Sequence, residues 1–261
     1  SACLVGSEMC IRDRLHIIGI EERKENNKTV IVRKAVERRD EASLLENTIN
    51  QLDAEDCLRH INGSLYGNDY EERLFNVAME LCITWMNRIL FLKLLEAQML
   101  KYHNGDAIYK FLSITKIHDY DDLNTLFFQV LARDMGSRTH SIMRDFAYVP
   151  YLNSSLFEVT DLESKTIKIN SLSQRTVLPV LASSVLRNKK RNLQVNALPT
   201  LQYLFAFLDA YNFASEGSEE VQEEAKTLIN ASVLGLIFEK INGHKDGSVF
   251  TPGFITMFMC R

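Results

Sequence analysis

Apolar residues recur at helical spacing along most of the chain, and the longest such stretch covers residues 70–102. Leu74 and Leu81 belong to one apolar stripe of this stretch, while Phe75 and Cys82 belong to a second. A helix that is apolar on two faces is buried between neighbouring elements. The pattern therefore predicts a long helix at the centre of the fold.

Shorter stretches with the same spacing predict further helices. They cover residues 37–62, 119–133, 200–213 and 219–242. Glycines in the INGSLYGND stretch predict a turn before the long helix, and His103-Asn104-Gly105 suits its C-terminal end.

Two regions predict β-structure. A β-branched run in residues 28–36 favours a strand. In residues 165–172 the alternation of Ile167 and Ile169 with lysines predicts a small hairpin with residues 156–160. Together with the helices, these regions predict a mainly α fold, a helical bundle with a small β-hairpin excursion.

The two ends of the chain predict its domain organisation. Residues 1–14, SACLVGSEMCIRDR, resemble a translated sequencing adapter, so we expect a non-native or disordered head. We expect a strand and helix segment over residues 15–62 and a helical domain over residues 63–242. Residues 243–261 contain a helix start followed by bare apolar residues, so we expect a further, truncated domain to begin there and the native chain to continue.

Composition narrows the class of protein. The 261 residues are 46% hydrophobic and 25% charged, which is typical of a soluble globular protein. The net charge of -4 gives no reason to propose nucleic acid or an anionic membrane as a partner. No apolar run reaches the roughly 18–20 residues that cross a bilayer. The five cysteines, without paired short spacings, fit a protein of the reducing cytoplasm.

Common catalytic and metal-binding motifs are absent from the sequence. It contains no glycine-rich dinucleotide or phosphate loop, no paired histidines or cysteines at metal-ligand spacing and no GxSxG nucleophile elbow. Glu22-Arg23-Lys24 matches the end of a metal-dependent nuclease core but lacks an upstream acidic partner, so we reject it. Asp119, Asp121 and Asp122 crowd a helix start, where they favour the helix dipole rather than a metal ion.

Two stretches are more specific than the rest of the sequence. They are VPYLNSSLFE at residues 149–158 and LINASVLGLIFEKINGHKDGSVFTPGFITMFM at residues 228–259. In this order and spacing they resemble a family of large bacterial adenine-specific DNA methyltransferases found in type IIG restriction–modification enzymes. The resemblance covers about residues 70–261.

This resemblance implies S-adenosylmethionine as the cofactor of the full-length protein. In the family, the aromatic-Thr-Pro segment, motif X, contributes to the cofactor pocket, and here it is Phe250, Thr251 and Pro252. Free N–H groups at a helix start suit the methionyl carboxylate. The family usually has tyrosine where Phe250 stands. Its catalytic Asn-Pro-Pro-aromatic motif and its glycine-rich loop would both follow residue 261, so we expect no catalytic residues in this chain.

The resemblance also implies double-stranded DNA as a partner. The basic loop of Arg187, Lys189, Lys190 and Arg191 would neutralise phosphates in a DNA enzyme, although such a loop is usually only solvated. For VPYLNSSLFE we favour a structural role over DNA contact. In that role Pro150 sets a turn, Asn153 or Ser154 caps, and the apolar side chains pack, namely Leu152, Leu156 and Phe157.

Two alternatives remain open. One is a non-catalytic helical protein-interaction domain whose apolar last helix docks a partner. The other is a phage-defence methyltransferase without a nuclease, which shares much of the same signature.

Overall fold

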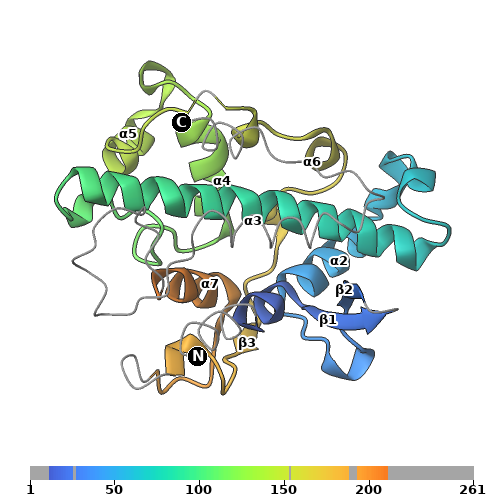
Figure 1. Ribbon diagram of the computed structural model, residues 1–261. Helices are drawn as coiled ribbons and strands as arrows, with labels where there is room; N and C mark the ends of the chain where they lie inside the picture. The colour runs from blue at the N-terminus through green and yellow to red at the C-terminus, as the bar shows by residue number, and fades with distance from the viewer. Residues whose placement is uncertain (1–11, 26–27, 153, 188–192, 211–261) are drawn as a thin grey trace.

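The fold is built around one long helix, α3 (Tyr70–Tyr102), in a computed structural model that describes residues 12–25, 28–152, 154–187 and 193–210. Figure 1 shows α3 crossing the whole molecule, with α4 (Tyr120–Thr125), α5 (His140–Phe146) and α6 (Asp161–Lys165) on one side. On the other side lie α2 (Leu44–Ala54) and α7 (Thr200–Asp209). The long helix is thus covered on two faces, as its two apolar stripes predict.

The ends of α3 follow from local chemistry. The Asp69 side chain caps the first turn by accepting a hydrogen bond of 2.8 Å from the Glu72 backbone N–H. At the other end Gly105 adopts a φ of +82°, and its N–H donates to the Leu100 carbonyl over 2.7 Å. The prediction of a helix over residues 70–102 is confirmed at both ends.

The shorter predicted helices are confirmed in part. The predicted helix over residues 119–133 is α4 followed by a π-helical turn, Leu126–Leu131. The helix expected over 37–62 is shorter, because Asp56 just after α2 is in the left-handed conformation, with a φ of 51°. The first ten residues of the helix expected over 200–213 form α7, and the helix expected over 219–242 lies outside the described residues.

Two small antiparallel sheets complete the fold. In one, β1 (Ile20–Glu25) pairs with β2 (Lys28–Arg33), which confirms the strand predicted within residues 28–36. In the other, β3 (Val177–Pro179) pairs with β4 (Ala197–Pro199). The described chain is therefore mainly helical with two two-stranded sheets, and the predicted fold class is confirmed.

The hairpin predicted from residues 156–160 and 165–172 is wrong. Short 3-10 turns occupy Ser155–Phe157 and Ile169–Ser171, and α6 lies between them. Helix α6 begins with a capping box in which Thr160 and Glu163 exchange side-chain-to-backbone hydrogen bonds. Ile167 and Ile169 are buried as expected, but Ile167 lies in irregular backbone and Ile169 begins a 3-10 turn instead of a strand.

Residues 12–14, which the sequence interpretation assigned to the head, lie in the folded part of the chain. They begin a helical segment over residues 12–18. The buried Asp13 carboxylate accepts hydrogen bonds from the Tyr203 hydroxyl at 2.6 Å and from the Ser184 hydroxyl at 3.1 Å. This segment is therefore joined to α7 and to the loop that precedes β4.

Charged side chains connect helix α7 to α3. Lys93 of α3 donates to Asp209 at the end of α7 over 2.6 Å and to Glu96 of its own helix over 2.5 Å. Glu96 also accepts a 2.6 Å hydrogen bond from the Leu112 backbone N–H.

Within the described part of the chain, no helix is long and apolar enough to span a membrane.

Candidate functional site

The VPYLNSSLFE motif is held to the middle of α3 by one arginine. Arg88 donates from Nε to the Leu156 carbonyl over 2.7 Å and from Nη2 to the Glu158 carbonyl over 2.8 Å. Phe157, between these two carbonyls in sequence, is fully buried and lies edge-on to Phe91 of α3 at a centroid distance of 5.8 Å. The motif is thus part of the core packing.

Arg88 also forms a fully buried ion pair with Glu163 of α6. Its two Nη atoms lie 2.6 and 2.9 Å from the two carboxylate oxygens, and the Trp85 indole N–H donates to the same carboxylate over 2.9 Å. The guanidinium lies 5.0 Å from the ring centroid of Phe128, within cation–π distance.

The Glu163 carboxylate keeps its charge in this buried position. Burial alone would raise its pKa, but the hydrogen bonds and positive charge of Arg88 lower it, and the N–H groups of Thr160 and Trp85 act in the same direction. The net effect lowers the pKa of Glu163 below its ordinary value, so this carboxylate is charged at neutral pH.

Two parts of the structural interpretation of the motif, the cap and the packing, are confirmed by the residues that the structure describes. The Ser154 side chain caps the turn by accepting a hydrogen bond from the Leu156 backbone N–H. Leu152 and Leu156 pack against the core, and Phe157 lies in it. Asn153, the other predicted cap, lies outside the described residues.

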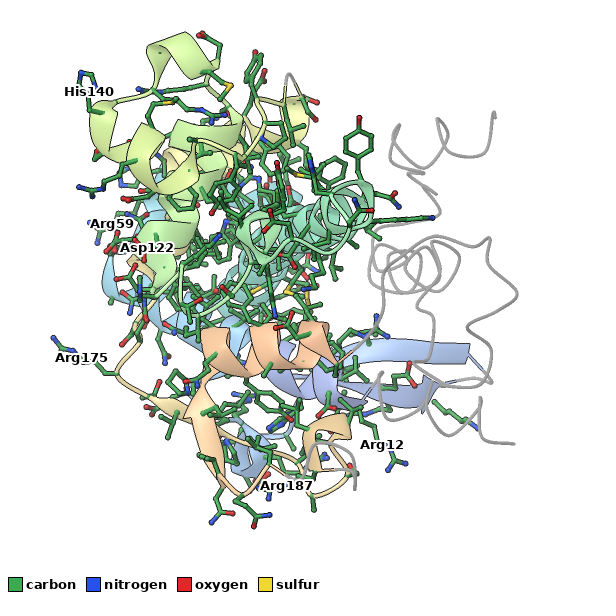
Figure 2. All side chains as sticks on the ribbon, turned by 90° about the vertical axis from the view of Figure 1, so that its left-hand side faces the viewer. Arg12, Arg59, Asp122, His140, Arg175 and Arg187 are labelled. Carbon is green, nitrogen blue, oxygen red and sulfur yellow. The ribbon has the colours of Figure 1, made fainter. Side chains whose placement is uncertain are left out.

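Arg187 of the predicted basic loop folds back onto its own loop. Its guanidinium donates to the backbone carbonyls of Val195 at 3.1 Å and of Leu193 and Val180 at 3.4 Å. Figure 2 labels Arg187 at the lower edge of the molecule. The structure therefore gives Arg187 a role in closing the loop between β3 and β4, and these contacts reduce its capacity to bind a phosphate.

The remaining predicted site residues lie outside the described residues. These are Lys189, Lys190 and Arg191 of the basic loop and Phe250, Thr251 and Pro252 of the cofactor motif.

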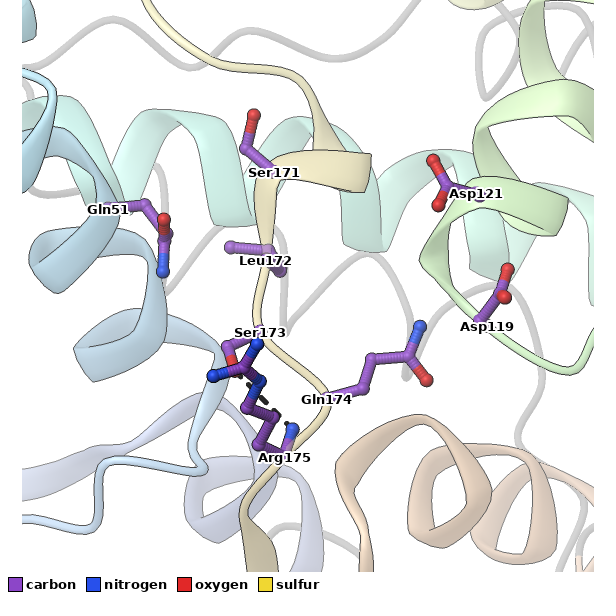
Figure 3. Close-up of a pocket in the computed structure, with 8 residues that line it drawn as sticks. All are labelled: Gln51, Asp119, Asp121, Ser171, Leu172, Ser173, Gln174 and Arg175. Carbon is purple, nitrogen blue, oxygen red and sulfur yellow. Dashed lines mark hydrogen bonds between the residues drawn. The ribbon is translucent and has the colours of Figure 1, made fainter.

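A polar hollow of about 650 Å³ lies between α2, the start of α4 and residues 171–175. Figure 3 shows Asp119 and Asp121 on one wall and Gln51 on the other, with Ser173, Gln174 and Arg175 on the chain between them. Of these, Arg175 is seen in Figure 2 to point away from the molecule.

The two carboxylates of the hollow have structural partners. Asp119 caps α4 by accepting a 2.8 Å hydrogen bond from the Asp122 backbone N–H, which confirms its predicted role at the helix start. Asp121 accepts from the Asn170 side chain over 3.1 Å. Among the described residues no three histidine, cysteine, aspartate or glutamate side chains are placed to hold a metal ion.

Sequence reasoning missed the pairing of Arg88 with Glu163. The two residues are 75 positions apart, so no local spacing joins them. A signal was present nonetheless, because Arg88 and its neighbour Asn87 interrupt an apolar part of α3 between Met86 and Ile89. A charged residue there requires a buried partner.

Comparison with known protein families gives a match. The family described as "Domain of unknown function (DUF7814)" matches residues 10–229. The chain belongs to this family. The DUF7814 match includes VPYLNSSLFE and Arg187 and stops before Phe250. No curated protein and no solved structure matches the chain.

Proposed function

We propose that this DUF7814 chain is the helical, DNA-positioning part of an adenine-specific DNA methyltransferase of a restriction–modification system of type IIG character. The observation that carries the proposal is the order and spacing of two motifs, VPYLNSSLFE and the later LGLIFEKINGHKDGSVFTPG segment. The whole enzyme would transfer a methyl group from S-adenosylmethionine to adenine N6 in double-stranded DNA, in the cytoplasm.

The packing around Arg88 supports a connecting role for the described domain. The ion pair with Glu163 and the hydrogen bonds to two motif carbonyls join α3, α6 and VPYLNSSLFE into one unit. Buried networks in which every group is satisfied rigidify the structure around them. A rigid helical unit is suited to hold a catalytic domain at a fixed position relative to DNA.

The cofactor would be bound partly by Phe250, Thr251 and Pro252. Thr251 followed by Pro252 predicts a helix start, and the free backbone N–H groups of the first helical turn would attract a carboxylate. In this proposal the Thr251 hydroxyl adds a hydrogen bond to the cofactor, and Phe250 packs against it.

A first test needs only the gene. Beyond residue 261 the reading frame should encode a glycine-rich loop and an Asn/Asp-Pro-Pro-aromatic motif within the next ~200 residues, a typical domain length. If neither motif is present, the methyltransferase proposal is wrong and a non-catalytic helical interaction domain takes its place.

A second test uses the assembled enzyme. We expect Thr251→Ala to weaken S-adenosylmethionine binding by about fivefold or more, the loss of roughly one hydrogen bond, without unfolding the protein. Isothermal titration calorimetry measures the affinity. The matched control is Thr139→Ala, at a helix start in α5 whose side chain makes no capping hydrogen bond. Unchanged affinity in Thr251→Ala would make Thr251 a helix cap only.

A further inference from the structure

One face of the long helix α3 is only partly buried, although it lies in the middle of the fold. Its residues are spaced alternately four and three positions apart, the spacing by which one helix packs along another. They are Ile83, Asn87, Leu90, Leu94 and Ala97, and we call them the α3 stripe. Leu90 is buried, whereas the other four are half-buried.

Other faces of α3 pack against described helices. The Cys82 Sγ lies 3.5 Å from the Thr48 hydroxyl of α2, and Arg88 pairs with Glu163 of α6. At 3.6 residues per turn, the centre of the α3 stripe lies about 100° round the helix from Cys82 and about 140° from Arg88. Figure 2, which looks toward the end of α3, shows the described helices to the left of α3 and below it. The α3 stripe therefore belongs to a third side of the helix.

Asn87 gives the α3 stripe a polar group that lacks a partner. Its Oδ1 atom is buried and accepts no hydrogen bond from any residue in the described part of the chain. Buried carbonyl oxygens in folded proteins are normally paired. A single asparagine within an apolar packing stripe is a known means of fixing the register of two helices. The α3 stripe thus has the composition of a helix–helix contact with one polar position.

The chain leaves its described part beside α3. Asp209, at the end of α7, accepts hydrogen bonds from Lys93 over 2.6 Å and from Lys110 over 2.8 Å, so α7 ends against α3 and the loop that follows α3. Residues 211–218 then precede the predicted helix over 219–242. Extended, these eight residues span up to about 28 Å, which exceeds the roughly 10–12 Å diameter of a helix. The predicted helix is therefore within reach of the α3 stripe.

The apolar side of the predicted helix matches the α3 stripe in length. Its apolar residues at helical spacing are Leu228, Ala231, Leu234, Phe238 and Ile241. In a helix these residues would extend over about 20 Å, and the α3 stripe extends over about 21 Å. The DUF7814 match runs to residue 229, so the family unit that contains α3 also contains the first part of the predicted helix.

We propose that residues 219–242 dock as a helix along the α3 stripe of the same chain. The apolar side chains of the two helices cover each other, and a polar side chain of the segment donates to the Asn87 Oδ1. The docked segment fixes the start of residues 243–261 relative to α3. The inference goes beyond the proposed function and holds whether or not the whole protein is a methyltransferase.

The test measures the rate at which a thiol on the α3 stripe reacts with excess maleimide in the full chain. Ala97→Cys supplies the thiol, and peptide mass spectrometry reports its labelling separately from that of the native cysteines. Adding Leu234→Asp should raise the rate about tenfold or more, because an unpaired carboxylate opposes burial of the segment. The matched control is Ser232→Asp, which adds the same charge outside the apolar positions of the segment and should leave the rate unchanged. Cys82, fully buried against α2, should stay unlabelled in every variant.

Three labelling results would overturn the inference: an unchanged rate with Leu234→Asp, an equal rise with Ser232→Asp, or an equal rise at Cys82, which would show general unfolding. Repeating the labelling at about tenfold lower protein concentration identifies the occupant. A constant rate supports docking within one chain. A faster rate on dilution would mean that a second copy covers the α3 stripe, and the proposal would be wrong.

Discussion

Arg88 is a charged side chain that the fold accommodates fully inside the core. Burying a guanidinium is unfavourable unless its nitrogens find acceptors, and here all three nitrogens donate, to two backbone carbonyls and to both oxygens of Glu163. Such a pair contributes little net stability over an apolar core, but removal of one partner leaves the other charge buried and unpaired. Loss of Arg88 would therefore destabilise the folded protein mainly by leaving the buried Glu163 carboxylate without a countercharge.

We expect Arg88→Met to lower the free energy of unfolding by about 3–5 kcal/mol, because Glu163 loses its countercharge while staying buried. Urea denaturation followed by circular dichroism measures the change. The control is Lys165→Ala, which breaks an exposed pair between Lys165 and Asp161 on the same helix, α6, and should cost less than about 1 kcal/mol. Similar losses in the two variants would show that the buried pair has no special role.

The junction between the first helical segment and β1 depends on Gly19. Its φ is +98°, and an added Cβ would lie 2.9 Å from the Ser43 Cβ. Ser43 itself is buried at the start of α2, where its hydroxyl donates to the Asp40 carbonyl over 2.8 Å. Glycine at this position therefore lets β1 begin directly against the N-terminus of α2.

Gly19→Ala should lower the free energy of unfolding by about 2–4 kcal/mol, since backbone strain and steric overlap with Ser43 add together. The matched variant is Gly105→Ala. Gly105 also has a positive φ, of +82°, but its added Cβ would meet no atom within 4 Å, so only the strain of about 1 kcal/mol applies. Thermal or urea unfolding of the two variants measures the difference. Equal losses in the free energy of unfolding would mean that the Ser43 side chain can move aside without destabilising the protein.

His16 links three parts of the molecule that are far apart in sequence. Its Nε2 donates to the Pro179 carbonyl of β3 over 2.7 Å, and its Nδ1 accepts from the Lys34 ammonium after β2 at 3.1 Å. Burial lowers the pKa of His16, and the charge of Lys34 lowers it further, while the Pro179 hydrogen bond and the carboxylates of Asp40 and Asp13 act in the opposite direction. The folded protein therefore favours the neutral imidazole.

This arrangement predicts that stability falls with acidification. Below the ordinary pKa of 6.5 the unfolded chain binds a proton at His16 that the folded chain resists, so the free energy of unfolding decreases as the pH falls from about 7 to about 5. His16→Gln should make this decrease smaller in urea titrations. His140→Gln, at an exposed position labelled in Figure 2, should leave the dependence unchanged. An unaltered dependence in His16→Gln would contradict the assignment.

Local features of the sequence determined α3, β2 and the start of α4. Apolar periodicity, an aspartate cap and a glycine stop act over a few residues, so the prediction for Tyr70–Tyr102 holds at both ends. The same locality explains why the packing role of Phe157 was predictable. Where two local signals compete, as at residues 156–172, the capping box of Thr160 and Glu163 prevailed over the alternation of isoleucines and lysines.

Only the tertiary structure decided which distant residues meet. Arg88 donates to carbonyls and a carboxylate 68 to 75 residues further along the chain, and His16 donates to the Pro179 carbonyl. Arg187 belongs to a loop that is basic in sequence, but its guanidinium donates to backbone carbonyls of that same loop. Such contacts depend on how the helices pack, and the apolar periodicity of one segment does not identify the segment against which it packs. The sequence thus determined the long helix and some of the shorter elements, while packing decided which charged and aromatic side chains are buried in the core.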